Sequence, residues 1–202
     1  MKTELIPVIH VLGLEQVMKN IHTCKLYGIK KFFLIGHQVE DKEVLEIANF
    51  IKQQYPKLWI GINLLGTPFQ ERIELEISPI DAMWFDETIT ERKTKNHLIF
   101  GGVDFKYQRK SYDLEADCKE AMKWVDVICT SGPRTGYPPL LSKIENMRSY
   151  IGDFPLAIAS GISSDNVSKF VGLVDYLMVA SSITDSGEII NEKKLEELVK
   201  LI

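Results

Sequence analysis

Residues 154–169 combine a short apolar run, a glycine turn and a cluster of hydroxyl side chains, which is a pattern typical of an anion-binding loop. The run Leu156–Ala159 has the composition of a strand buried on both faces. The turn is followed by serines suited to cap a helix. A helix that starts directly after a glycine turn offers free backbone N–H groups and the positive end of its dipole. The first half of the predicted phosphate site is Ser160, Gly161, Ile162 and Ser163.

The same pattern returns about twenty residues later, where the apolar run Tyr176–Ala180 ends in two serines. Small and hydroxyl residues at two successive strand ends, near the carboxyl end of an α/β chain, predict a phosphate held between two loops. Ala180, Ser181 and Ser182 form the second half of this predicted site. The alternative is that both loops are ordinary connections between a strand and a helix and bind nothing.

Polar side chains also stand where other predicted strands end, and in a barrel the chemistry gathers at these ends. Asp104 is our first candidate for a general acid or base, and Lys106, a lysine able to form a Schiff base or hold an anion, is the next. Asp86 and His10 complete the predicted catalytic set, and Asn63 is expected to line the ligand. The alternative for each is a strand-end residue whose polar atoms are satisfied by loop backbone.

The stretch 130–139 is too rich in glycine, proline and hydroxyl residues to be a helix or a strand. Its two glycines allow the backbone to approach a ligand closely, and Arg134 has the forked shape that suits an anion. A rigid surface loop is the equally weighted alternative. The predicted ligand-lining residues of this loop are Thr130, Ser131, Gly132, Arg134, Thr135 and Gly136.

Strand-like and helical segments alternate along the whole chain, which predicts a parallel sheet. Eight strands favour a compact (β/α)8 TIM barrel made of a single domain over residues 1–202, with an open doubly wound sheet as the alternative. The charged segment 87–97 is too short for a full helix, so we expect an irregular unit between strands four and five. The predicted strands are 5–11, 31–36, 58–65, 82–86, 98–104, 125–129, 156–159 and 176–180, and the predicted helices are 14–27, 41–55, 68–77, 114–124, 140–151, 167–173 and 192–202.

Composition and charge are those of an ordinary soluble protein, with 45% hydrophobic and 26% charged residues. The net charge of −4 argues against non-specific binding to nucleic acid. No apolar run approaches the length of a membrane span, and no signal pattern opens the chain, so we expect a cytoplasmic protein. Three widely spaced cysteines and four histidines form no zinc pattern, and no metal is predicted.

Three segments together resemble the BtpA family of phosphate-binding TIM-barrel proteins. They are Thr-Ser-Gly-x-x-Thr-Gly-x-x-Pro at 130–139, Ala-Ser-Gly-Ile-Ser-Ser-Asp-Asn-Val at 159–167, and Ala-Ser-Ser-Ile at 180–183 with Gly187 and Asn191 beyond it. The resemblance is clearest over residues 125–191. Gly61-Ile-Asn-Leu-Leu is similar to the family's third strand, and Asp104-Phe-Lys stands where the family has a segment ending in lysine. Ala180 replaces a family glycine, and Thr184 and Asp185 replace basic residues.

The resemblance and the residue pattern together imply a barrel that binds a small phosphorylated metabolite at the carboxyl ends of its strands. We expect an enzyme, for example a phosphosugar isomerase or lyase. The alternative is a non-catalytic ligand-binding protein or an assembly and biogenesis factor. The cofactor and the substrate are not determined by the sequence, and a homo-oligomer is left open.

Overall fold

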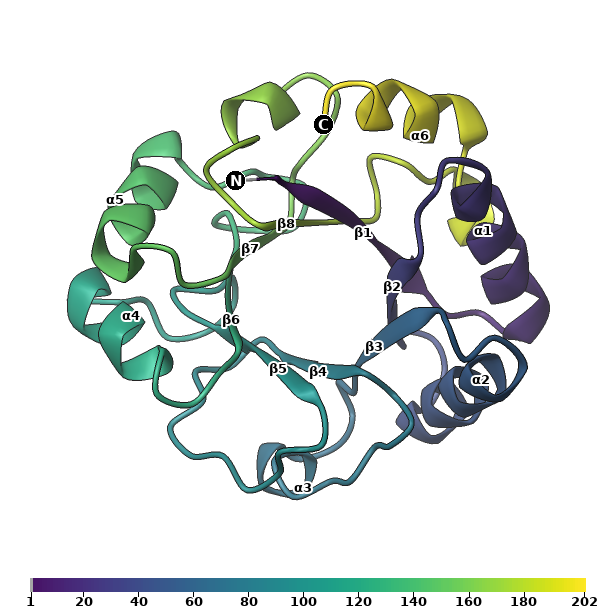
Figure 1. Ribbon diagram of the computed structural model, residues 1–202, viewed down its shortest axis with the longest axis horizontal. Coiled ribbons are helices and arrows are strands. Elements are labelled where there is room, and N and C mark those ends of the chain that lie inside the picture. Colours follow the sequence, from purple (N-terminus) through teal and green to yellow (C-terminus); the bar gives the residue numbers. More distant parts are fainter. Residues whose placement is uncertain (1) are drawn as a thin grey trace.

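The computed structural model describes residues 2–202 and shows a closed barrel of eight parallel strands that follow one another in sequence order (Figure 1). The barrel closes because β1 pairs with β8, with Leu5 opposite Leu177. The predicted (β/α)8 fold is therefore confirmed, and the open sheet is excluded. The strands are β1 (Glu4–His10), β2 (Lys31–Ile35), β3 (Trp59–Asn63), β4 (Ala82–Phe85), β5 (Leu98–Gly102), β6 (Val127–Thr130), β7 (Leu156–Ala159) and β8 (Tyr176–Val179).

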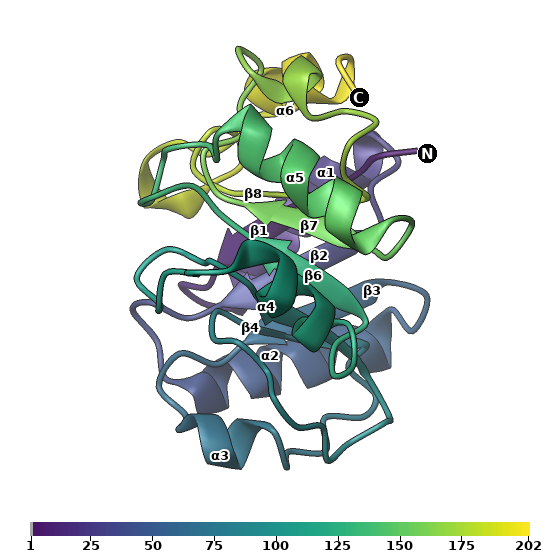
Figure 2. The same ribbon diagram turned by 90° about the vertical axis from the view of Figure 1, so that its left-hand side faces the viewer.

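Helices surround the barrel on its outside, as the views along and across it show (Figure 1, Figure 2). Residues 86–97, between β4 and β5, contain no helix, so this unit is irregular as predicted. The α-helices are α1 (Leu14–Leu26), α2 (Asp41–Gln54), α3 (Phe69–Arg72), α4 (Leu114–Ala121), α5 (Leu141–Ile151) and α6 (Glu192–Val199); the 3-10 turns are η1 (Val167–Lys169) and η2 (Ser186–Glu188).

Two predicted helices are much shorter than expected. The helix predicted over 68–77 ends at Arg72, because the apolar residues at 73, 75 and 77 alternate with glutamates at a period of two, which suits extended chain. The helix predicted over 167–173 is only the turn η1. Gly172 leaves the helical region there, with a φ of 83°, and the chain then enters β8. No helix therefore follows the glycine turn at 160–161.

The interior of the barrel is filled at its centre by aromatic rings. The Phe33 ring makes edge-to-face contacts with Trp59, Trp84 and Phe100, with centroids 5.3, 5.7 and 5.0 Å apart. Gly61 is needed beside this cluster, because a Cβ there would collide with the Phe33 ring. The barrel is thus closed below the carboxyl ends of the strands.

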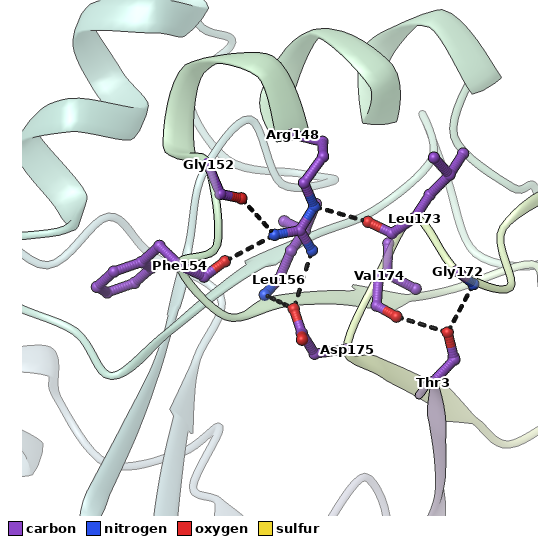
Figure 3. Close-up of polar contacts among 9 residues, drawn as sticks. All are labelled: Thr3, Arg148, Gly152, Phe154, Leu156, Gly172, Leu173, Val174 and Asp175. Carbon is purple, nitrogen blue, oxygen red and sulfur yellow. Dashed lines mark hydrogen bonds and ion pairs between the residues drawn. The ribbon is translucent and has the colours of Figure 1, made fainter. Parts of the chain in front are cut away.

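The opposite end of the barrel carries a repeated ion-pair arrangement. An aspartate stands directly before each of β4, β6 and β8, and its carboxylate accepts the backbone N–H at the start of the preceding strand, at 2.7, 2.8 and 2.9 Å. A basic side chain neutralises each carboxylate at 2.8–2.9 Å. This arrangement joins neighbouring strands at their amino ends, the end of a barrel that contributes to stability. The pairs are Asp81 with Lys52, Asp126 with Arg92, and Asp175 with Arg148, the last shown in Figure 3.

Candidate functional site

A cavity of about 600 Å³ opens at the carboxyl ends of the strands, where a barrel site was predicted. Its inner surface is made by side chains from β1, β2, β4 and β8, among them Val8, Ile35, Trp84 and Met178. Its walls are the loops that follow β2 to β8. The predicted site residues that line it are His10, Asp86, Lys106, Thr135, Gly136, Ser160, Gly161, Ile162, Ser163, Ala180, Ser181 and Ser182.

The wall formed by the loops after β7 and β8 presents backbone donors. Within residues 2–202, the N–H groups of Gly161, Ile162, Ser181 and Ser182 have no protein acceptor. Such N–H groups suit a phosphate oxygen. The whole predicted phosphate set thus lies on one wall of the cavity.

Three of the predicted donors are engaged inside the protein instead, one of them the Ser160 hydroxyl, which donates to the Arg134 carbonyl at 3.4 Å. The Ser163 N–H donates to Asn166 Oδ1 at 3.1 Å, and the Ser182 hydroxyl donates to the Ile162 carbonyl at 2.6 Å. The hydrogen bond from the Ser182 hydroxyl therefore joins the β8 loop to the β7 loop. Because no helix begins here, the expected helix dipole is also absent, and the backbone N–H groups remain as the anion donors.

The loop 130–139 contributes to the cavity with its second half only. Thr135, Gly136 and Pro138 line the cavity, whereas Thr130, Ser131, Gly132 and Arg134 do not. The buried Thr130 hydroxyl donates to the Val103 carbonyl at 2.8 Å, and Ser131 Oγ accepts the Lys106 N–H at 2.7 Å. The buried residues Thr130, Ser131 and Gly132 therefore support the site from behind, whereas Arg134 is exposed and its guanidinium lies over the Tyr137 ring, 3.9 Å from the centroid.

The cavity is also lined by Asp86, directly after β4, and by Lys106, in the loop after β5. Burial raises the pKa of the Asp86 carboxyl, and the Lys106 charge and a hydrogen bond from Asn63 oppose this rise in part. Asn63 Nδ2 donates to Asp86 Oδ1 at 3.2 Å, so this fully buried amide orients the carboxyl and does not itself line the cavity. Lys106 Nζ lies over the Phe105 ring, 4.7 Å from its centroid, and 3.5 Å from the Ala159 carbonyl oxygen. A carboxyl with a raised pKa in a cavity is a candidate general acid or base.

Asp104, our first catalytic candidate from the sequence, is placed differently. Its side chain does not line the cavity, and its Oδ2 lies 2.8 Å from Lys143 Nζ. Its Oδ1 accepts the Ser111 N–H at 3.1 Å. Burial raises the pKa of Asp104, but the bonds from Lys143 and Ser111 outweigh burial and hold it below the usual value. The structure therefore gives Asp104 a structural position, in which it holds the loop after β5 against α5.

Asp104→Asn is accordingly expected to destabilise the protein by about 1–3 kcal/mol at pH 7, the range for hydrogen bonds to charged groups. Because the folded-state pKa is lowered, the carboxylate contributes stability above its unfolded pKa and loses it as the pH falls through its folded value. The difference in the free energy of unfolding between variant and wild type should thus shrink toward pH 2. Urea unfolding at pH 7 and at pH 2.5 measures this difference. An equal loss of stability at both pH values would contradict the ion-pair explanation.

Two histidines meet at the edge of the cavity. His10, from the end of β1, and His37, just after β2, both line it, and their rings pack edge to face with centroids 4.9 Å apart. His10 Nδ1 lies 3.1 Å from Glu188 Oε2. Burial lowers the pKa of His37, with His10 as the next cause. Glu188 belongs to no local motif and was not predicted from the sequence, whereas His37, a polar residue at the end of a predicted strand, and Asn166, within the segment 159–167, line the cavity without having been assigned a role.

The buried cysteines are unsuited to nucleophilic chemistry. Burial raises the pKa of the Cys24 and Cys118 thiols to about 12, and Cys129 is buried within β6 as the sequence predicted. Among the residues that the structure describes, no group of three or more His, Cys, Asp or Glu side chains is arranged to hold a metal ion. Over the same residues, no helix has the length and apolar character required to cross a membrane.

Comparison with known proteins identifies the fold and no closer relationship. No family model and no curated protein sequence matches this chain. Among solved structures, a native KDPGal structure superposes with a TM-score of 0.74 at 10% identity, covering 100% of this chain and 95% of the other. The 2-keto-3-deoxy-6-phospho-gluconate aldolase from Zymomonas mobilis gives 0.69 at 12% identity, covering 98% and 91%. Phosphoribosyl anthranilate isomerase from Thermus thermophilus gives 0.64 at 12%, covering 98% of each chain. What this chain shares with these proteins is the barrel fold.

Proposed function

We propose that this protein is a BtpA-like barrel enzyme that binds a small phosphorylated carbonyl compound and moves protons next to its carbonyl group, as an isomerase or lyase does. The observation that carries this proposal is a single cavity lined both by backbone anion donors from the loops after β7 and β8 and by Asp86 and Lys106. The aldolase and isomerase names of the structural neighbours are in keeping with it, as an analogy of fold.

The donor loops after β7 and β8 have one role in this proposal, and Asp86 and Lys106 have another. The N–H groups of Gly161, Ile162, Ser181 and Ser182 would hold the phosphate. The carbonyl end would then lie toward Asp86 and Lys106. The phosphate is remote from the reacting atoms, so the free energy of binding it can be used to position the substrate.

Asp86 replaces Asp104 as the first candidate for the general acid or base. Burial disfavours the charged form of the Asp86 carboxyl and raises its pKa, so this carboxyl holds its proton to a higher pH than an exposed aspartate does. Lys106 would polarise the substrate carbonyl, either as an ammonium ion or through a Schiff base. The Asn63 amide fixes the Asp86 carboxyl in place.

Phosphate recognition is tested by calorimetric titration with dihydroxyacetone phosphate and with unphosphorylated dihydroxyacetone. Only the phosphorylated compound should bind. Ser181→Ala removes a hydroxyl at the cavity and keeps the backbone N–H, so it should weaken binding by about 0.5–3 kcal/mol, the value of the one hydrogen bond that this hydroxyl would add. Ser149→Ala, whose hydroxyl lies on α5 and donates to the Asn146 carbonyl, is the matched control and should bind like wild type. Equal binding of both compounds would exclude the phosphate site, and equal binding of both variants would exclude the Ser181 hydroxyl as one of its donors.

A second candidate function is that of a ligand-binding assembly factor. It is favoured by large apolar side chains in the loops around the cavity, since Tyr112, Leu140 and Tyr107 are 95%, 75% and 74% exposed. Deuterium exchange into dihydroxyacetone phosphate distinguishes the two functions. An enzyme should exchange the protons next to the carbonyl, and Asp86→Asn should abolish the exchange, whereas an assembly factor would bind without exchange. Native mass spectrometry of the purified protein would identify a phosphometabolite that it retains.

A further inference from the structure

The contact between His10 and Glu188 joins opposite ends of the chain at the edge of the cavity. His10 ends β1 and lines the cavity, while Glu188 belongs to the turn η2 after β8 and does not line it. The His10 Nδ1 and Glu188 Oε2 atoms are 3.1 Å apart, and both side chains are largely buried, with exposed fractions of 22% and 30%. The carboxylate thus stands behind the imidazole as seen from the cavity.

This distance fixes the protonation pattern of the imidazole. If Nδ1 were bare, its lone pair would face a carboxylate lone pair, so Nδ1 must carry a proton. Nε2 is then the nitrogen that is free to accept a proton when the ring is neutral. Within residues 2–202, His10 Nε2 has no hydrogen-bond partner.

Glu188 is held in place by a second layer of contacts from α1. Gln16 Nε2 and Asn20 Nδ2 both donate to the Glu188 carbonyl at 2.8 Å, and the buried Asn20 also accepts the Ile190 N–H at 2.9 Å. Glu188 has a φ of 54°, a left-handed conformation that is unfavourable for a residue with a Cβ. The surrounding contacts therefore maintain a strained backbone that directs this carboxylate at His10.

We propose that His10 is a second general acid–base group of this cavity and that Glu188 is its positioning residue. This inference rests on the proposed function. β1 and β5 lie on opposite sides of the eight-strand ring (Figure 1), and His10 ends β1 whereas Lys106 belongs to the loop after β5. A site with two such groups suits a substrate in which one proton leaves and another is added at a different position, as in the interconversion of a phosphorylated aldose and ketose.

The proton balance is complete without a further reactant. His10 Nε2 takes a proton from the substrate hydroxyl or carbon, and the imidazolium that forms is neutralised by the Glu188 carboxylate, while Nδ1 keeps its own proton. Asp86, in its protonated form, supplies a proton on the other side. As the cycle closes, the His10 imidazolium gives its proton back to the substrate at the second position and Asp86 takes one from it, so both groups return to their starting states. His37 packs on the His10 ring and restricts its rotation.

The tautomer of His10 tests the positioning role without any ligand. Long-range ¹H–¹⁵N spectra of protein labelled at histidine should show neutral His10 with the proton on Nδ1. Glu188→Ala should move that proton to Nε2, Glu188→Gln should keep it on Nδ1 through the amide oxygen, and Glu196→Ala on α6 should leave the spectrum unchanged. A wild-type His10 protonated on Nε2 would overturn the assignment even if no variant folds.

The catalytic role is tested by deuterium exchange into dihydroxyacetone phosphate. His10→Asn is expected to slow exchange by about 10²-fold, a typical contribution of one acid–base group, with phosphate binding retained. Glu188→Ala should lower the exchange rate with an unchanged KM. Glu188→Gln should exchange at a rate between those of Glu188→Ala and wild type. Exchange equal to wild type in His10→Asn would overturn the role of His10. If the wild-type protein does not bind dihydroxyacetone phosphate at all, the proposed function is overturned, but the tautomer assignment still holds.

Discussion

Gly161→Val is expected to abolish phosphate binding altogether. Gly161 has a φ of 68°, and a Cβ at this position would collide with the backbone of Tyr137 and Pro138. A side chain here must therefore push the loop 130–139 away from the β7 loop. The displacement would also move the Gly161 and Ile162 N–H groups that we assign to the phosphate. Calorimetry with dihydroxyacetone phosphate should show no heat of binding.

The control for this variant is Gly172→Val. Gly172 also has a left-handed backbone, with a φ of 83°, but no atom lies within 4 Å of the position that a Cβ would take there, and Gly172 does not line the cavity. Both variants share the cost of placing a Cβ in that conformation, about 1–2 kcal/mol. Only Gly161→Val adds the collision. Normal binding by Gly161→Val would show that the two loops do not hold the phosphate.

Arg148→Met is expected to cause the largest loss of stability away from the cavity. The Arg148 guanidinium donates to the carbonyls of Leu173, Gly152 and Phe154 at 2.9, 2.8 and 3.0 Å (Figure 3). It also donates to the Asp175 carboxylate at 2.9 Å. Removing it leaves a partly buried carboxylate and three carbonyls without their donor. We expect a loss of about 3 kcal/mol, the low end of the range for breaking a buried ion pair.

Urea unfolding at pH 7 measures this loss, with Arg109→Met as the control. Arg109 pairs with Asp117 at 3.1 Å, but its side chain is 61% exposed, so its removal should cost at most about 1 kcal/mol. Phosphate binding should be unchanged in both variants, because neither residue lines the cavity. Equal stability of the two variants would mean that the ion pairs at the amino ends of the strands do not stabilise the barrel.

The sequence determined the barrel and the two loops that we propose for the phosphate, because both depend on local pattern. Short apolar runs such as Leu156–Ala159 can be satisfied only by a strand covered on both faces, and eight of them with covering helices close a ring. Gly161 was recognised for the same reason, since the backbone of a tight turn is read from its own residues. Where local pattern was ambiguous, as over 167–173, the predicted helix was wrong.

Only the tertiary structure decided which polar strand-end residues serve the cavity. Asp86 and Asp104 have the same side chain and equivalent positions in the sequence pattern, yet Lys143, 39 residues further on, pairs with Asp104 and leaves Asp86 to the cavity. His10 and Glu188 are joined across almost the whole chain because β8 closes on β1. Such pairings depend on the register between strands and on the paths of the loops. Neither is encoded in the few residues around each side chain, and so neither could be predicted from them.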